Sequence, residues 1–427
     1  MASLSRTMGT PTNAYKGTVS VWVKRCAFTG NLGIFNGNSD ASNLTEAYFN
    51  ADGTLSFYAN SGGSVDLKTS RVFRDPAAWY HVVYAWDTTQ GSSTDRVKLY
   101  INGVQETVFS PATYPGSSQI LQTNISGNTF NVGAVQGGTG FDGNMAHFHF
   151  IDGLQYAASD FGETDSTSGI WVAKTSPSVT YGDNGFFLKF ASGAITTDSS
   201  GEGNTMTQVG TITTTKDTPD NNFATLNLLD GNIINSGGLQ NGGTTYNKSS
   251  TGSGYNTTCL STLAVSSGKW YWETKIADAS AIVSGFMNTD HGAFNAHYNL
   301  FNVTAGDGWG WYNNGTRFVG TTQTASYFNT FTTNDIISFA LDLDNGKCYA
   351  AKNGTWENSG DPTSGATGTG SFADITTSST YFITPACTNN NYAVASKVYY
   401  NFGNGYFGTT SHGETNADDA GIGLFKY

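Results

Sequence analysis

The strongest constraint on the fold is an alternation of apolar and polar residues with period two, interrupted repeatedly by short turn sequences. It is clearest in the stretch DIISFALDLDNGKCYAAKNG, Asp335 to Gly354. Successive side chains of a strand point to opposite faces, so this pattern is typical of a half-buried β-strand. The apolar residues that share one face of the expected strand are Ile337, Phe339, Leu341 and Leu343.

Two Asn-Gly pairs in this stretch predict where the chain reverses. Asn345-Gly346 would supply the two positive-φ residues of a type I′ turn, KCYAAK would return as the partner strand, and Asn353-Gly354 would turn the chain again. The first pair also resembles part of a calcium loop. Counting back from Gly346 places leucines at two ligand positions and Lys352 where the last carboxylate should be, so the calcium interpretation fails and a hairpin is expected.

Similar strand-and-turn units recur along the chain. TVSVWVKR, GTLSFYAN, WYHVVYAW and RVKLYING are strand candidates in the first half, and GKWYWETKI, GWGWYNNGTRFVG and SKVYYNFGNG are candidates in the second. Aromatic residues make up 14% of the chain and there are 53 glycines, which suits pleated surfaces joined by turns. We therefore predict an all-β protein with two antiparallel β-sandwich (jelly-roll) domains in tandem.

The boundary between the two sandwiches is predicted where apolar alternation is lost. The segment SGAITTDSSGEGNTMTQVGTITTTKDTPD is polar and Thr-rich, with little to bury. We assign residues 1–190 to the first sandwich, 191–230 to a polar linker that can include the first strand of the next domain, and 231–427 to the second sandwich. No residue-level repeat relates the two halves.

Charge and cysteine content restrict the partners. With 20 Lys+Arg against 32 Asp+Glu the net charge is −12, so attraction to phosphate backbones is disfavoured and no nucleic-acid partner is expected. No apolar run is long enough for membrane insertion, and MASLSRTMGTPTNAYKG lacks the apolar core of a signal peptide. The cysteines form no CxxC pair, which favours a reducing cytoplasm as the place of folding. They are Cys26, Cys259, Cys348 and Cys387.

Both halves of the chain carry resemblances to known folds. WYHVVYAWDTTQGSSTDRVKLYINGVQETV, with FDGNMAHFHFIDG further on, resembles the laminin-G-like, concanavalin A-type jelly roll over roughly residues 1–190. The second half resembles a SPRY domain at GKWYWETKI, at DIISFALDLDNGKCYAAKNG and at Pro385-Ala386 followed by YYNFG. These resemblances imply two sandwiches, but the first fold carries lectins, glycosidases, adhesion modules and structural domains alike.

A narrower resemblance concerns the whole chain. RTMGTPTNAYKGTVSVWVKR, SDFGETDSTSGIW and DTPDNNFATLN are similar to segments of joined lectin-like and SPRY-like proteins of tailed phages, marine ones in particular. This implies a non-enzymatic structural component of the virion, in the head or the tail, made in the host cytoplasm and displayed on the virion surface. The expected partners are other virion proteins, further copies in a homo-oligomer and host-surface polysaccharide. A carbohydrate-binding receptor adhesin and a polysaccharide-degrading glycoside hydrolase remain as alternatives.

The sequence does not support catalysis. Glycosidases on the jelly-roll fold place acids as Glu-x-Asp-x-Glu, or with one more spacer, so that alternate residues face the cleft. Glu163-Thr-Asp165 comes nearest, but it lacks a third acid and its Gly, Ser and Thr neighbours indicate a loop, so we interpret both acids as turn or capping residues. G-x-S-x-G and phosphate-loop motifs are missing. We predict no enzyme activity, no catalytic residue and no cofactor.

The histidines are the candidate metal ligands. His147-Phe-His149 would place two imidazoles on one strand face, but HFHFIDGLQ contains no Glu, and Asp152 falls on the opposite face of a regular strand. His81 could converge from another strand, which the sequence alone does not decide. We interpret these as ordinary sandwich histidines and predict no metal site. The same interpretation applies to His291 and His297, beside Asp290.

The aromatic residues of the second half are the candidate carbohydrate contacts. Sugar recognition uses exposed aromatic faces beside polar groups, and GDGWGWYNNGTRF places Trp309, Trp311 and Tyr312 among Asn, Asp and Gly. Trp309 and Trp311 would share one strand face. The alternative, which the sequence leaves open, is that they are core aromatics of the second sandwich. Trp270 and Trp272 are predicted to be plain core residues.

Overall fold

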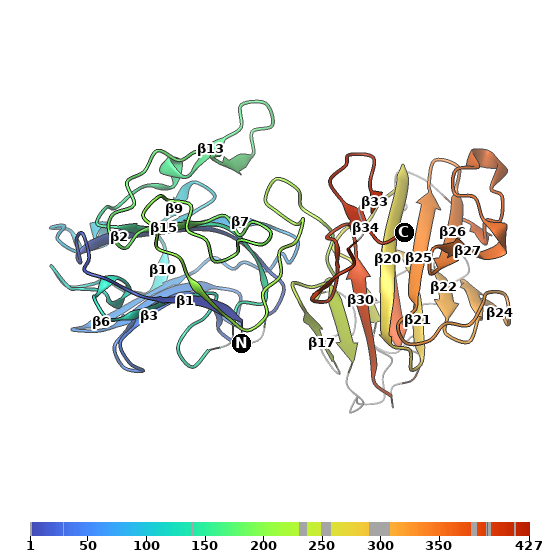
Figure 1. Cartoon of the computed structure of the whole chain (residues 1–427), viewed down its shortest axis with the longest axis horizontal. Coiled ribbons are helices and arrows are strands. Elements are labelled where there is room, and N and C mark those ends of the chain that lie inside the picture. The colour runs from blue at the N-terminus through green and yellow to red at the C-terminus, as the bar shows by residue number, and fades with distance from the viewer. Residues whose placement is uncertain are drawn as a thin grey trace. The chain divides into compact units, whose positions relative to one another are not determined.

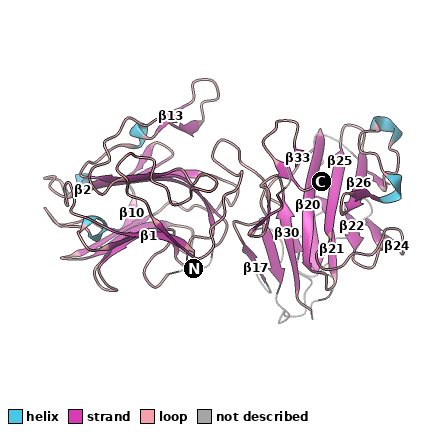
Figure 2. Ribbon diagram, in the orientation of Figure 1, coloured by secondary structure: helices cyan, strands magenta, loops and turns pink. Residues whose placement is uncertain are grey.

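The computed structural model describes the chain except for residues 1, 29, 139, 230–236, 249–257, 290–307, 377–381, 390, 392–393 and 414–415. It divides into two compact units, unit 1 (residues 1–214 and 218–222) and unit 2 (215–217 and 223–427). Both consist of antiparallel β-sheets, and the only helices in the described part are short 3-10 turns (Figures 1 and 2). The predicted fold class, all-β with two sandwiches in tandem, is confirmed. Within the same residues, no helix is long and apolar enough to span a membrane.

Unit 1 contains two main sheets, which form the two layers seen in Figure 1. In spatial order the first sheet consists of β10 (Phe109–Thr113), β6 (Ser64–Thr69), β5 (Leu55–Asn60), β4 (Leu44–Phe49), β3 (Leu32–Asn38), β11 (Thr129–Val132), β1 (Ser3–Thr7) and β16 (Thr207–Val209). The second consists of β15 (Phe186–Leu188), β12 (Gly143–Asp152), β2 (Lys16–Arg25), β7 (Tyr80–Asp87), β8 (Val97–Ile101) and β9 (Val104–Glu106). A separate hairpin, β13 (Gly162–Thr164) with β14 (Trp171–Ala173), lies outside the second sheet. The 3-10 turns of unit 1 are η1 (Ser93–Asp95), η2 (Gln122–Asn124) and η3 (Ala158–Asp160).

The core of unit 1 fills the space between these sheets, as the alternation predicts. Val19, Val21 and Val23 of β2 are fully buried in it, opposite aromatic residues of the first sheet such as Phe35 and Phe57. Side chains of the same strands that point away from the core form the outer faces of the two sheets. Those outer faces differ in what covers them.

The segment predicted as a linker begins inside unit 1. Residues 191–214 still belong to it, and β16 pairs antiparallel with β1 through Ser3↔Val209 and Ser5↔Thr207. Asp198 of the same segment accepts hydrogen bonds from the backbone N–H groups of Phe187 and Ser200. A polar, Thr-rich sequence can therefore close a sheet edge, where one face of the strand stays in solvent.

Asp152 holds one end of unit 1 together. Its carboxylate is buried and accepts hydrogen bonds from the backbone N–H groups of Thr12 (2.7 Å), Asn13 (3.3 Å) and Asn184 (3.0 Å). The side-chain amide of Asn124 in η2 donates a further short bond. These donors come from three segments far apart in the sequence, so the charge of Asp152 is satisfied by its structural role.

Unit 2 repeats the two-layer design. In spatial order its first sheet consists of β17 (Gly237–Gln240), β18 (Thr245–Lys248), β30 (Ser396–Asn401), β20 (Lys269–Asp278), β25 (Ile336–Asp342), β26 (Lys347–Lys352) and β27 (Thr355–Trp356), with β28 (Ala373–Asp374) also paired to β26. The opposing sheet consists of β19 (Thr258–Leu260), β29 (Ile383–Asn389), β21 (Ile282–Asn288), β22 (Gly308–Tyr312), β23 (Arg317–Val319) and β24 (Thr322–Thr324). Two short pairs complete it, β31 (Tyr406–Phe407) with β32 (Thr410–Ser411) and β33 (Asn416–Ala417) with β34 (Leu424–Phe425); its 3-10 turns are η5 (Glu357–Ser359) and η6 (Gly365–Thr367).

A buried carboxylate fixes the final described segment of unit 2. Glu273 of β20 is fully buried and accepts hydrogen bonds from the backbone N–H groups of Lys426 (2.9 Å) and Tyr427 (2.8 Å). The Tyr271 hydroxyl (3.0 Å) and the Asn401 side-chain amide (2.9 Å) donate the remaining bonds. Glu273 therefore binds backbone N–H groups of this segment, and these bonds do not depend on the identity of the side chains of Lys426 and Tyr427.

One of the two predicted turns differs from expectation. Asn353 and Gly354 both have positive φ (50° and 80°) and join β26 to β27 as a two-residue turn, which confirms that prediction. Between β25 and β26, however, the last pair is Asp342↔Lys347, so the loop has four residues and the predicted type I′ turn is wrong. The Asp342 carboxylate accepts hydrogen bonds from both the backbone N–H and the side-chain amide of Asn345, which favours the wider loop.

Candidate functional site

The aromatic residues predicted to contact carbohydrate lie mostly in the core of unit 2. Trp309 is 1% exposed and stacks on Phe286 at 5.2 Å between ring centroids, and Trp311 is 0% exposed. Tyr312 is half-buried and packs against Phe318. Because neither indole presents a face to solvent, the carbohydrate-contact interpretation fails for both tryptophans, and the core alternative accounts for them.

Trp270 departs from its prediction in the opposite sense, because it is exposed. It was predicted to be core together with Trp272, yet Trp270 is 47% exposed while Trp272 is 2% exposed. The two residues share a strand face, but Trp270 is the second residue of β20, at the end of the sandwich. Its indole N–H donates to the backbone oxygen of Ser267 (2.7 Å), so the ring is held against the loop that precedes the strand.

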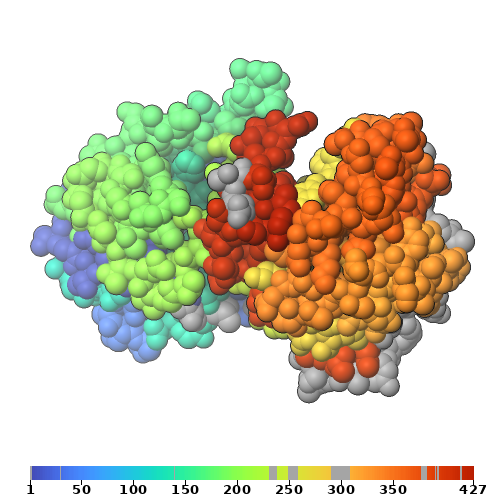
Figure 3. All heavy atoms as spheres, turned by 45° about the vertical axis from the view of Figure 1, so that its right-hand side comes forward, coloured from blue at the N-terminus to red at the C-terminus, as the bar shows by residue number. Residues whose placement is uncertain are grey.

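Glu163 and Asp165 belong to the hairpin that projects from unit 1 (Figures 1 and 3). Asp165 accepts bonds from the backbone N–H groups of Thr167 (3.1 Å) and Ser168 (2.7 Å), which confirms it as a turn residue. These bonds, the Ser168 bonds first, lower the pKa of Asp165 below its ordinary value. Glu163 is exposed in β13, opposite Val172, so it is a strand residue and not a cap.

His147 and His149 do not share a regular strand face. The pairing of β12 with β2 shifts between Ala146 and His149, and His147 has φ +49°, which marks a bulge. His149 is buried, stacks on Phe187 at 3.9 Å between ring centroids, and its Nδ1 lies 2.9 Å from the Tyr181 hydroxyl. The strand is therefore not the regular platform that the metal interpretation requires.

His81 lies close to a serine hydroxyl, in an arrangement that resembles a nucleophile and its base. Its Nε2 is 2.8 Å from the Ser20 hydroxyl oxygen, while the indole N–H of Trp171 donates to its Nδ1 at 3.0 Å. An indole N–H can only donate, so Nδ1 must be the unprotonated nitrogen of the neutral ring. Nε2 then carries the hydrogen and donates to Ser20. In this tautomer His81 cannot take a proton from the hydroxyl, and both side chains are sealed from solvent.

The electrostatics of the histidines agree with this neutral, structural role. Burial lowers the pKa of His81 to about 3, with His147 adding to the effect, and burial lowers the pKa of His149 well below its ordinary value. The described residues contain no group of three or more His, Cys, Asp or Glu side chains that could hold a metal ion. His291, His297 and Asp290 lie outside the described residues.

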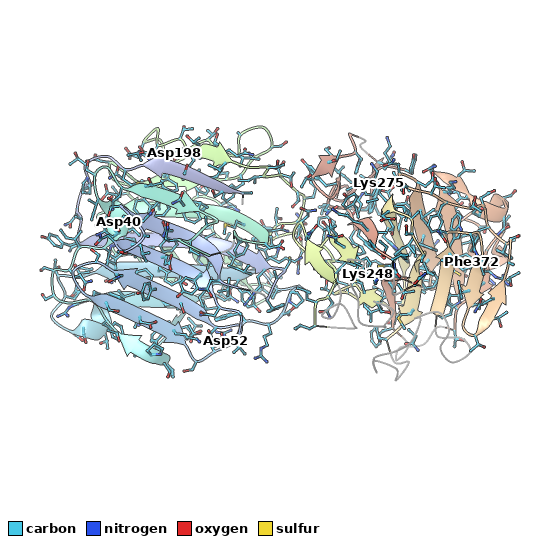
Figure 4. The ribbon with its side chains drawn as sticks, turned by 90° about the horizontal axis from the view of Figure 1, so that it is seen from below. Asp40, Asp52, Asp198, Lys248, Lys275 and Phe372 are labelled. Carbon is cyan, nitrogen blue, oxygen red and sulfur yellow. The ribbon has the colours of Figure 1, made fainter. Side chains whose placement is uncertain are left out.

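The remaining candidate is the outer face of the first sheet, onto which Figure 4 looks. On β4, β5 and β6 the apolar residues point into the core, so the alternate residues point out. Register then aligns Glu46, Tyr58 and Asp66 in one row across three strands, with Tyr48 two residues from Glu46 on the same strand. Asn36 of β3 lies opposite Glu46 on its other side. We call these five residues the Tyr48–Tyr58 face.

This face is polar and partly accessible. Tyr48, Tyr58 and Asp66 are half-buried, and no hydrophobic cluster of the described residues includes either tyrosine. Glu46 is 7% exposed, and its Oε2 accepts bonds from the Asn36 side-chain amide (3.3 Å) and the backbone N–H of Gln136 (3.1 Å). The face thus combines aromatic rings, carboxylates and an amide, the residue types that recognise sugars.

Burial raises the pKa of three ionisable groups of this face. It raises the pKa of Glu46 and of Asp66, and it raises the pKa of Tyr48 to about 12, with the charges of Glu46 and Asp66 adding to the effect. Each shift reflects a negative charge held with too little water around it. Perturbation of ionisable groups by burial and by neighbouring charges, at an accessible surface, is shared by many functional sites.

The sequence contained a signal for this face that strand prediction alone did not use. Residues 44–69 form three consecutive strands joined by short turns, so their neighbours in the sheet are the adjacent strands of the sequence. Such meanders allow the register to be read from turn lengths. Pairing GTLSFYAN with the strands on either side would have placed Tyr58 between two acids.

Comparison with known proteins identifies the jelly roll of unit 1. Residues 3–157 match the family model of the concanavalin A-like lectin/glucanases superfamily, so this part of unit 1 is similar to the jelly-roll domains of that superfamily. No curated protein matches the chain.

Solved structures similar to parts of the chain include SPRY, pentraxin and arabinanase domains. The SPRY domain of human HERC1 is 17% identical, over 38% of this chain and 91% of that one, with a TM-score of 0.27. The heptameric SAP-like pentraxin from Limulus polyphemus is 18% identical, over 41% and 87%, with a TM-score of 0.29. Domain 4 of AbnA, an extracellular arabinanase from Geobacillus stearothermophilus, solved with arabinotriose, is 21% identical, over 34% and 64%, with a TM-score of 0.27.

Proposed function

We propose that this chain is a non-enzymatic interaction protein whose unit 1 binds glycans through the Tyr48–Tyr58 face. The observation that carries this proposal is the row Glu46, Tyr58 and Asp66 on an accessible sheet face of a concanavalin A-like domain. Aromatic rings pack against the apolar side of a sugar ring, while carboxylates and amides bind its hydroxyl groups. By contrast, the outer face of the second sheet is covered, and His81 and His149 are buried on it near aromatic residues such as Phe161.

The register of the row supports the proposal of binding without hydrolysis. Two carboxylates that cleave a glycosidic bond must face each other across the bond, with room for the sugar or a water molecule between them. Glu46 and Asp66 lie two strands apart, and the side chain of Tyr58 stands directly between them in the sheet. A sugar can rest on Tyr58, but its scissile bond cannot descend between the acids.

The biological setting that we propose is the surface of a tailed-phage virion, in its head or tail. This part rests on the resemblance of three segments, RTMGTPTNAYKGTVSVWVKR, SDFGETDSTSGIW and DTPDNNFATLN, to joined lectin-like and SPRY-like phage proteins. The partners would be other virion proteins and further copies of the chain, with host-surface polysaccharide as the ligand of unit 1. The alternative is a carbohydrate-binding adhesin that is not part of a virion and that binds glycans through the same face.

Three measurements test the proposal. The full chain, labelled on lysine, is applied to a glycan array, and we expect signal from the wild type that is lost in Tyr58→Ala. Release of reducing sugar from every bound glycan is measured in parallel; activity that disappears in Asp66→Asn would replace binding by hydrolysis. Gold-labelled antibody on purified particles tests the virion setting, and protein found only free in the lysate would favour the adhesin.

A further inference from the structure

We infer that the ligand of the Tyr48–Tyr58 face is an uncharged glycan, bound through hydroxyl groups that donate to carboxylates, and that anionic glycans are rejected. This inference rests on the proposed function, because it specifies the ligand of the same face. It is carried by the balance of hydrogen-bond acceptors and donors in the row, and by the charges around it.

The face offers acceptors that nothing in the described structure uses. Both bonds to Glu46 go to Oε2, so its Oε1 has no donor among the described residues, although the residue is 7% exposed. The carboxylate of Asp66 likewise has no hydrogen-bond donor in the described part of the chain. Burial raises the pKa of both carboxyl groups, yet none of their oxygens is among the buried side-chain atoms of the described residues that lack a partner, so the unused oxygens are open to solvent. A ligand that donates hydrogen bonds can replace the water there.

The amide of the face and the lysine of β6 are already engaged. The Asn36 side-chain amide donates to Glu46. Lys68, which follows Asp66 on β6, forms an ion pair with Asp52 at 2.7 Å. A carboxylate or sulfate group on a ligand would therefore meet two acids and no uncommitted lysine of β6, so repulsion disfavours it.

The spacing suits one sugar ring. Neighbouring strands lie about 4.8 Å apart, so the Cα atoms of Glu46 and Asp66 are roughly 10 Å apart with Tyr58 midway between them. Tyr48 is the diagonal neighbour of Tyr58 across β4 and β5, about 7–8 Å away at Cα. A pyranose resting on Tyr58 can thus point equatorial hydroxyls toward both carboxylates, while the next residue of the glycan contacts Tyr48.

The test compares neutral and anionic oligosaccharides of equal length on the full chain. The probes are hexasaccharides of glucose, mannose and galactose, and hexa-galacturonate, each titrated and followed by saturation-transfer NMR. We expect binding of at least one neutral probe and binding of hexa-galacturonate at least tenfold weaker. Losing one charge-assisted hydrogen bond should weaken the neutral probe about tenfold in Asp66→Asn.

Glu46→Gln is the sharper variant. Its remaining oxygen can still accept from Asn36 and Gln136, while the new NH₂ group replaces the unused acceptor with a donor. We expect weaker binding of the neutral probe and stronger binding of hexa-galacturonate, a reversal that simple loss of folding does not produce. Glu202→Gln, the same chemical change on an exposed loop of unit 1, is the matched control for net charge and should leave both affinities unchanged.

The outcomes separate the two proposals. Tight binding of hexa-galacturonate by the wild type overturns the inference and leaves glycan binding standing. If the neutral probes bind equally well to the wild type and to Glu46→Gln, Asp66→Asn and Tyr58→Ala, the binding site lies elsewhere and the inference is overturned. No binding of any probe overturns the proposed function and the inference with it. Thermal unfolding of each variant shows that the compared proteins are folded.

Discussion

Acid should destabilise unit 1 through His81. The ring lies between Trp22 and Trp171, at 4.9 and 6.0 Å between centroids, and accepts a hydrogen bond from the Trp171 indole at Nδ1. A second proton on the ring would place an N–H against that indole N–H and a positive charge in a sealed apolar layer. The folded state therefore resists a proton that the unfolded chain takes up readily.

The size of the effect follows from the two pKa values of His81. The ordinary value is 6.5 and burial lowers it to about 3 in the folded state. Because the folded pKa is depressed, the stabilisation is complete above pH 6.5 and is lost as the pH falls toward 3. Each pKa unit corresponds to about 1.4 kcal/mol, so His81 alone should remove about 2 kcal/mol at pH 5 and about 5 kcal/mol near pH 3. His149 acts with the same sign.

Urea unfolding of unit 1 can be measured within the whole chain by labelling Cys26. This thiol is buried, and the other three cysteines all belong to unit 2. A dipyridyl disulfide reacts with thiols at acid pH as well as neutral pH, and mass spectrometry identifies the labelled peptide. The midpoint of Cys26 labelling is determined at pH 8 and pH 5 for the wild type and for His81→Gln. Glutamine retains one acceptor for Trp171 and one donor for Ser20 but does not titrate.

We expect His81→Gln to be less stable than the wild type at pH 8, because ring stacking is lost, and to lose about 2 kcal/mol less between pH 8 and pH 5. Ser20→Ala is the matched control, since it disturbs the same buried contact by removing the partner of Nε2 but keeps the titrating ring, so its pH dependence should follow the wild type. Equal slopes for the wild type and His81→Gln would refute the assignment of His81 as a neutral structural residue.

Three further predictions concern single side chains. Asp152→Asn should destabilise unit 1 by about 3 kcal/mol in the Cys26 assay, because the new NH₂ group opposes backbone N–H donors. A loss below 1 kcal/mol would contradict the structural role of Asp152. Trp272→Ala should cost about 3–5 kcal/mol and Trp270→Ala under 1 kcal/mol in urea unfolding of unit 2, and the reverse order would contradict their burial. Glu273→Gln should speed hydrogen exchange at the Lys426 and Tyr427 amides, and unchanged protection would show that side chains hold this segment.

The core was predictable because it depends on alternation alone. The valines of β2 and the apolar residues of β25 face inward as their spacing requires. Asn353-Gly354 also turned as predicted, since both residues accept positive φ. Asn345-Gly346 did not, because the nearby Asp342 carboxylate offered Asn345 two hydrogen bonds that a tight turn could not make. A local side chain thus outweighed the turn preference.

The candidate site was harder to predict, because burial depends on where a strand ends and on what covers it. Period two correctly placed Trp270 and Trp272 on one face, but it could not show that Trp270, near the start of its strand, is exposed. Trp309 and Trp311 had polar neighbours in sequence, yet Asn313 and Asn314 lie in a turn and the indoles lie inside. The row around Tyr58 depends on register across three strands, which composition and motif searches do not contain.

The pairing of β16 with β1 has a consequence for synthesis of the chain on the ribosome. β1 emerges well before Thr207–Val209, with which its outer edge pairs and which lie beyond the end of the family match at residue 157. Until then β1 presents an unpaired strand edge, the kind of edge to which a neighbouring nascent chain can add. The polar, serine-rich sequence of β1 and the Thr-rich sequence of β16 therefore suit two strands that pair late. A more apolar β1 would be prone to aggregate before β16 is synthesised.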